Sequence, residues 1–192
     1  MILKKLVVGP LETNCYILAA RAGGEAVVID PGEEGERILE ALKEDGLKLK
    51  YIINTHGHFD HVGADAYLKE ATRAAICFHP DDALVKPDIV LTDGQFLEIK
   101  GISITIIETP GHSGGSVSLL IDGKLFTGDL LFSGSVGRTD LPGGSFEALS
   151  DSLRKISSLP DETEIYPGHG PETTLGQEKR TNPYMQEFEG EE

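Results

Sequence analysis

The stretch NTHGHFDH, residues 54–61, places three histidines and one aspartate within six consecutive positions of a chain that has only six histidines. Imidazole nitrogens and carboxylate oxygens bind metals and transfer protons, and they also occur in ordinary polar loops. His56 and His58 are two residues apart, so along extended backbone their side chains point to the same side. Asp60 and His61 turn in another direction if a helix begins there. One short loop could therefore supply ligands to two adjacent metal ions.

Three more residues of the same chemical types follow glycine or Pro-Gly turns at the ends of expected strands. They are His112 in TPGHSGGS, Asp129 in FTGDLLFSGS and His169 in YPGHGP. Such turns direct a side chain outward from a strand end, where loops converge on ligands. The remaining histidine, His79 in FHPDD, is expected to begin or cap a short helix with Pro80.

The elements that must position these residues are short strands and amphipathic helices. In the first half, apolar runs predict strands and 3.6-residue periodicity predicts helices. Strands are expected at 3–9, 15–20, 26–30, 49–55 and 74–79, and helices at 33–45 and 63–72. The strand at 49–55 runs directly into the histidine-rich loop.

The second half repeats this style without a strict sequence repeat. Strands are expected at 96–99, 102–109, 116–121, 124–129 and 164–168, and a helix at 145–159 with Ser145 as its N-cap. The pattern predicts an α/β protein of one domain, residues 1–192, built from two βα halves that meet near residue 95. Two facing sheets with helices outside give a four-layer αββα sandwich.

Composition narrows the functional classes. Lys and Arg number 17 against 32 Asp and Glu, a net charge of −15 that repels nucleic acid and anionic lipid. Part of this charge lies in the tail EFEGEE, residues 187–192, which is expected to be a solvated end. No apolar run approaches the roughly 20 residues that span a bilayer. The apolar stretch before Gly9 and Pro10 is too short for the hydrophobic region of a secretory signal. We therefore expect a cytoplasmic protein.

The two cysteines, Cys15 and Cys77, lie in apolar stretches without CxxC spacing. They are expected to be small buried core residues. A metal in this chain would therefore be held by nitrogen and oxygen.

The motif THGHFDH resembles the T-H-x-H-x-D-H signature of the metallo-β-lactamase fold hydrolases, and the PGH, GD and GH elements follow in that family's order. The resemblance covers nearly the whole chain and implies the family's αββα fold. It also implies a two-metal site. His56, His58 and His112 would hold a first metal, Asp60, His61 and His169 a second, and Asp129 would bridge them.

Two divalent ions are the implied cofactors, zinc first, with iron or manganese as alternatives, because the donors are imidazole and carboxylate. Such a pair lowers the pKa of a shared water from about 15.7 toward 7 and polarises a carbonyl, so hydroxide is available at neutral pH. Asp60 has a second expected role as a catalytic acceptor that orients the nucleophile. Thr55, Ser113 and Thr127 either orient ligands or are ordinary turn hydroxyls.

The segment DLLFSGSVGRTDLPGGS is similar to the glyoxalase II-like thioesterases and to the persulfide dioxygenases. Arg138 matches the position of a cationic substrate-binding side chain in glyoxalase II, and it could instead pair with Asp140. Glyoxalase II has a C-terminal helical domain and a tyrosine shortly after its last histidine ligand, whereas 23 residues follow His169 here and the sequence from His169 onward reads HGPETT. The segment TNPY near its end is similar to the compact, single-domain members of the group.

The expected function is therefore metal-dependent hydrolysis of an S-acylglutathione-type thioester, a small molecule, and the sequence leaves the oligomeric state open. One alternative is a persulfide dioxygenase with a single non-haem iron on His56, His112 and Asp129. Another is a metal-binding module without catalysis. A structural metal more commonly has a closed, cysteine-rich set of four ligands, which disfavours the module.

Overall fold

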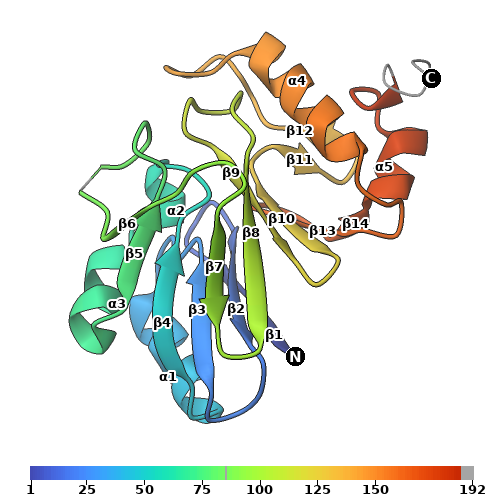
Figure 1. The fold of residues 1–192 in the computed structure, drawn as a ribbon. Helices are drawn as coiled ribbons and strands as arrows, with labels where there is room; N and C mark the ends of the chain where they lie inside the picture. Colours follow the sequence, from blue (N-terminus) through green and yellow to red (C-terminus); the bar gives the residue numbers. More distant parts are fainter. Residues whose placement is uncertain (85, 187–192) are drawn as a thin grey trace.

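A computed structural model describes residues 1–84 and 86–186 of the chain, so the acidic tail at 187–192 lies outside the described residues. Two six-stranded sheets form the centre of the molecule (Figure 1). The chain completes the first sheet before it enters the second. Within the described residues, no helix has both the length and the apolar character needed to cross a bilayer.

The first sheet has the strand order β1-β2-β3-β4-β5-β6. Its antiparallel part is β1 to β3, and from β3 to β6 the strands are parallel. The strands are β1 (Ile2–Val8), β2 (Thr13–Ala19), β3 (Glu25–Ile29), β4 (Lys48–Ile53), β5 (Ala75–Phe78) and β6 (Ile89–Val90). Helices α1 (Gly35–Glu44), α2 (Phe59–Val62) and α3 (Asp65–Thr72) belong to this half.

The second sheet has the order β14-β13-β10-β9-β8-β7 and is antiparallel except for the pair β10 and β13. Its strands are β7 (Phe96–Ile99), β8 (Ile102–Glu108), β9 (Val117–Ile121), β10 (Lys124–Gly128), β13 (Glu164–Pro167) and β14 (Thr173–Thr174). A separate hairpin joins β11 (Leu131–Phe132) to β12 (Ser135–Val136), and the helices of this half are α4 (Phe146–Ser157) and α5 (Leu175–Thr181).

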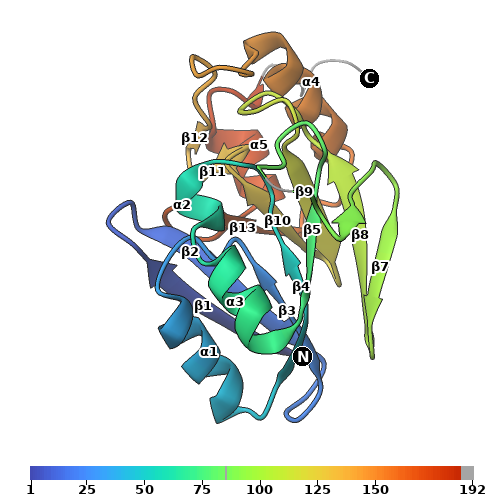
Figure 2. The same ribbon diagram turned by 90° about the vertical axis from the view of Figure 1, so that its left-hand side faces the viewer.

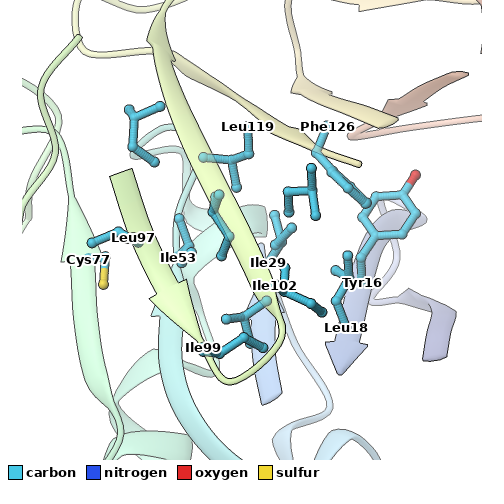
Figure 3. Packing of buried hydrophobic residues seen from close by; sticks show 14 of the residues in the cluster. Tyr16, Leu18, Ile29, Ile53, Cys77, Leu97, Ile99, Ile102, Leu119 and Phe126 are labelled. Atoms are coloured by element: carbon cyan, nitrogen blue, oxygen red, sulfur yellow. The ribbon is translucent and has the colours of Figure 1, made fainter. Parts of the chain in front are cut away.

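The two sheets pack face to face through a shared apolar core (Figure 3). Leu18 and Ile29 from the first sheet meet Leu119 and Phe126 from the second. A second cluster includes buried residues of α1 and α3, and a third includes buried residues of α4 and α5. Figure 2 shows these helices from the side. The order helix, sheet, sheet, helix confirms the predicted four-layer αββα sandwich.

Most of the expected elements are present within a few residues of their predicted ends, and Ser145 caps α4 by accepting from the Ala148 amide. The predicted helix at His79 and Pro80 is wrong. Residues 79–82 form a turn instead, in which the Asp81 amide donates to the His79 ring and the Asp82 amide to the His79 carbonyl. Hydrogen bonds from the Gly57 and Gly115 amides to Asp82 hold this turn in place.

Phe126 provides a test of the core between the sheets. Its ring is buried and packs within 5.0 Å, centroid to centroid, of both Tyr16 and Tyr166. Replacing it with alanine removes these contacts and leaves a cavity, so Phe126→Ala should lower the free energy of unfolding by about 3–5 kcal/mol. Phe96→Ala is the matched control, because Phe96 is 65% exposed and its loss should cost less than about 1 kcal/mol. Urea unfolding of both variants measures the difference, and similar losses would contradict this account.

Candidate metal centre

The predicted ligand residues all follow the carboxyl ends of strands, in loops and in the short helix α2, which meet at one edge of the sandwich. The loop after β4 leads into α2, and the other loops follow β8, β10 and β13 of the second sheet. The residues are His56, His58, Asp60 and His61 after β4, His112 after β8, Asp129 after β10 and His169 after β13. Both halves of the chain therefore contribute to one site.

Two groups of donors lie side by side. His56, His58 and His112 form the first cluster, and their donor atoms lie within 4.8 Å of one another. His58 Nδ1 is 2.8 Å from His112 Nε2. Each of these distances is short enough for one ion to contact all three rings.

Asp60, His61 and His169 form the second cluster, again with donor atoms within 4.8 Å of one another. His169 Nε2 is 3.2 Å from Asp60 Oδ2 and 3.3 Å from His61 Nε2. Asp129 lies between the clusters. Its Oδ1 is 3.5 Å from His61 Nε2, and its Oδ2 is 3.5 Å from His112 Nε2. The structure thus brings all the predicted ligand residues together, while their binding of metal stays a prediction.

Unsatisfied buried atoms show that these residues fit a cation. His56 Nε2 and Asp129 Oδ1 are buried without a hydrogen-bond partner among the described residues. Leaving such an atom unpaired costs about 1–3 kcal/mol, and more for a charged group. A divalent ion on these atoms would remove that cost, and the nitrogen and oxygen donors suit zinc, iron or manganese.

Backbone carbonyls set the orientation of two ligand rings. His112 Nδ1 donates to the Arg138 carbonyl oxygen at 2.8 Å, and His169 Nδ1 donates to the Leu11 carbonyl oxygen at 3.0 Å. Because a carbonyl oxygen only accepts, the proton of each neutral ring is on Nδ1. Nε2 then presents its lone pair to the cluster, as a metal ligand must.

Asp30, which follows β3, orients the loop after β4 through hydrogen bonds. It accepts from both the amide and the hydroxyl of Thr55 at 2.7 Å and lies 3.0 Å from His61 Nδ1. Thr55 Oγ1 is in turn 3.1 Å from His56 Nδ1. The sequence suggests a place near the site for Asp30, at the turn after a strand, and the structure adds its contact with the His61 ring. Thr127 serves the turn only, since its hydroxyl donates to the Leu131 carbonyl.

Sequence reasoning did not identify Thr13 and Asn14, the first two residues of β2, as neighbours of the site. Thr13 Oγ1 donates to Asp60 Oδ2 at 3.1 Å, and Asn14 Nδ2 donates to the carbonyls of Pro167 and Gly170 on either side of His169. A Thr-Asn pair opening a fully buried strand was the available signal, because buried polar side chains require partners. Thr13 and Asn14 belong to the first sheet, and their hydrogen bonds fix Asp60 and the turn of His169 in the second cluster.

Burial and neighbouring charges act differently on the ligand histidines. Burial, together with the nearby histidines, holds the pKa of His56 well below its usual value, so the ring is neutral and ready to bind metal. Burial also lowers the pKa of His58. For His61 burial acts the same way, but Asp30 and the other carboxylates outweigh it and raise the pKa to about 9.

The Asp60 carboxylate remains ionised at neutral pH. Burial alone would raise the pKa of Asp60, but its hydrogen bond with His169 and the charge of His61 hold that pKa below its usual range. Within the part of the chain that the structure describes, Asp30, Asp60 and Asp129 form ion pairs with histidines and with no lysine or arginine. Divalent cations would supply the missing positive charge.

Comparison with known proteins identifies relatives of this chain in sequence and in fold. The sequence profile of the Metallo-beta-lactamase superfamily matches residues 8–169. The hydroxyacylglutathione hydrolase GloC of Haemophilus influenzae is 40% identical over 83% of this chain and 87% of its own. The crystal structure of ETHE1 from Myxococcus xanthus has a TM-score of 0.91 and 34% identity, covering 98% of this chain and 88% of its own. The crystal structure of TTHA1623 in a di-iron-bound form has a TM-score of 0.83 and 41% identity, covering 94% and 99%.

The chain therefore belongs to the metallo-beta-lactamase superfamily, a family of metal-dependent hydrolases. Its members bind divalent metals, and the histidine and aspartate clusters of this chain could hold such ions. The resemblance read from THGHFDH is thus confirmed at the level of the family and its fold.

Arg138 lies in the loop after β12, and its side chain pairs with Asp140. Arg138 Nε and Nη2 each donate to one oxygen of that carboxylate at 2.7 Å, and the arginine side chain is 61% exposed. The pairing that the sequence offered as an alternative is therefore present. Substrate binding by Arg138 stays a prediction.

Asp65, the first residue of α3, allows a test of how stability depends on pH. Burial raises its pKa to about 7, against the effect of the hydrogen bond from Asn54. The folded state then holds more protons than the unfolded state between about pH 4 and pH 7, so stability falls as pH rises through this window. Asp65→Asn removes that loss. At about pH 8 it should raise the free energy of unfolding on the order of 2 kcal/mol, and below about pH 4 the gain should vanish.

Urea unfolding of the metal-free protein at both pH values measures this gain. Asp151→Asn is the control, because Asp151 is an exposed partner of Arg154 on α4 and should change stability by less than about 1 kcal/mol at either pH. An equal effect of Asp65→Asn at both pH values would show that ionisation of Asp65 does not set the difference.

Proposed function

We propose that this protein is a thioesterase that uses two divalent metal ions to hydrolyse S-acylglutathione-type thioesters. The observation that carries the proposal is the pair of adjacent donor clusters with Asp129 between them. A paired site of this kind suits hydrolysis, because bound divalent ions supply an acidic water and polarise a carbonyl oxygen. A purely structural site would have a single, closed set of ligands.

The chain's own residues prepare this chemistry. Asp60 stays a carboxylate at neutral pH, so it is able to accept a hydrogen bond from the attacking water and orient it. Thr13 fixes that carboxylate by donating to Oδ2. The carbonyls of Leu11 and Arg138 hold two ligand rings in the tautomer that presents Nε2. The site is thus oriented before substrate arrives, which lowers the reorganisation needed during reaction.

Likeness to GloC, a hydroxyacylglutathione hydrolase by name, supports the substrate class. We propose zinc as the metal and keep iron as the alternative, since TTHA1623 was crystallised in a di-iron-bound form. Manganese also fits the donor set. The proposed partner is a small-molecule thioester, and neither nucleic acid nor a membrane is part of the proposal. A cytoplasmic location stays a prediction.

A second candidate is a persulfide dioxygenase that binds one iron through His56, His112 and Asp129. His112 Nε2 and Asp129 Oδ2 are 3.5 Å apart, and the two histidines belong to the first cluster. Two histidines and one carboxylate are the facial set of non-haem iron enzymes. The structural likeness to ETHE1 supports keeping this candidate.

Parallel assays separate the two candidates. Metal-loaded protein should hydrolyse S-lactoylglutathione and should not consume oxygen with glutathione persulfide. Oxygen uptake without hydrolysis would replace the thioesterase with the dioxygenase. Absence of both activities, in protein shown to contain metal, would refute the proposal and favour a non-catalytic module.

Ligand variants then test the number of metals required. His58→Ala and His169→Ala each remove a donor from a different cluster, so each should lower kcat/KM for the thioester on the order of 100-fold or more. Metal content of each variant is measured alongside activity. Full activity in both would rule out the two-metal mechanism, and a loss confined to His112→Ala would favour one iron.

Arg138 tests substrate recognition. An arginine that binds the carboxylate of the glutathione moiety acts on binding, so Arg138→Ala should raise KM about 10-fold and leave kcat nearly unchanged. Arg154→Ala is the matched control, because Arg154 is another exposed arginine paired with an aspartate, on α4. Equal KM values for Arg138→Ala and the wild-type protein would contradict substrate binding by Arg138 and leave its ion pair with Asp140 as its only role.

A further inference from the structure

Asp82 lies in the loop between β5 and β6, drawn in green in Figure 1, and it contacts two ligand-bearing loops at once. Its Oδ2 accepts from the Gly57 amide at 3.0 Å and from the Ser113 hydroxyl. Its Oδ1 accepts from the Gly115 amide at 2.9 Å. One carboxylate thus receives three hydrogen bonds from two segments that are distant in the sequence.

The donors of these hydrogen bonds lie beside ligands of the first cluster. Gly57 is the residue between His56 and His58, and Ser113 directly follows His112. The Ser113 hydroxyl also lies 2.6 Å from Ser116 Oγ, so its position is fixed from two sides. Asp82 therefore fastens both backbone segments that carry the first cluster.

The two glycines show how closely this loop approaches. A Cβ atom at Gly57 would lie 2.3 Å from the Asp82 carbonyl oxygen, and one at Gly115 would lie 2.8 Å from the Asp82 amide nitrogen. Real Cβ atoms do not come this near to backbone atoms. The glycines of HGH and HSGG are therefore required by the approach of residue 82, in addition to any need of the metal site.

The second cluster depends on other residues. Thr13 holds Asp60, Asn14 and the Leu11 carbonyl hold the turn of His169, and Asp30 contacts His61. Among the hydrogen bonds and ion pairs of the described residues, none joins Asp82 to a member of the second cluster. The supports of the two clusters are thus separate.

We propose that Asp82 is a positioning residue for the first metal site, and that it sets the affinity of that site independently of the second. Its negative charge strengthens the three hydrogen bonds, which hold His58 and His112 at the spacing one ion requires. The inference rests on the proposed two-metal function. It concerns metal binding rather than turnover, so it can be tested without a thioester.

Asp82→Asn keeps the size of the side chain but removes its charge and turns one acceptor into a donor that faces an N–H or O–H group. Zinc affinity at the first site should fall about 10–100-fold, with the second site unchanged. Titration of the metal-free protein with zinc against a chromophoric chelator measures both affinities. Anomalous scattering from crystals equilibrated at limiting zinc assigns each loss to a site.

Thr13→Val is the matched control, because it removes one hydrogen bond from the second cluster. It should weaken zinc binding at the second site and spare the first. Thermal unfolding of the metal-free variants separates positioning from general stability. Unchanged first-site affinity in Asp82→Asn, or an equal loss at both sites, would overturn the proposal.

If Asp82→Asn does not fold, Ser113→Ala decides the question, since it removes a single donor and leaves the carboxylate with both backbone amides. A smaller loss confined to the first site supports the proposal, and no selective loss overturns it. The proposed function fails separately. Wild-type protein that binds two zinc ions without hydrolysing thioesters would refute the thioesterase and leave the role of Asp82 intact.

Discussion

The electrostatic balance at the edge of the sandwich constrains the rest of the structure. Asp30, Asp60 and Asp129 lie close together in a largely buried site, and among the described residues histidines are their only ion-pair partners. Burying several carboxylates without compensation is costly, so the fold must bring imidazoles and cations to them. The strand-end turns, the buried polar pair at the start of β2 and the short helix α2 all serve that requirement.

Much of the fold and of the site was predictable from the sequence because its signals were local. Apolar runs and helical periodicity marked the long elements, and the HxHxDH spacing marked the ligand loop. The sequence did not predict the shortest elements, because so few residues cannot display a hydrophobic periodicity. These are the two-residue strands β6, β11, β12 and β14 and the helix α5. Their existence depends on tertiary contacts. Asn182, for example, ties the end of α5 to the Ser135 carbonyl of β12.

The residues that orient the ligands were harder to predict than the ligands themselves. Asp30, Asn14 and Asp82 act through hydrogen bonds to segments far away in the sequence, and nothing in their neighbouring residues reveals those partners. The error at His79 has the same origin. A Pro after a histidine favours a helix start locally, but the loop after β5 is held in place by contacts with Gly57 and Gly115 instead.

The origin of the ligands in both sheets has a consequence for the lifetime of the folded chain. An ion that joins the loop after β4 to the loops after β8, β10 and β13 acts as a cross-link between the halves of the sandwich. Binding energy of this kind is available only to the folded state and adds to its stability as the free metal concentration rises. Resistance to proteases would then follow the cell's metal supply, so scarcity of metal would reduce the amount of protein as well as its activity.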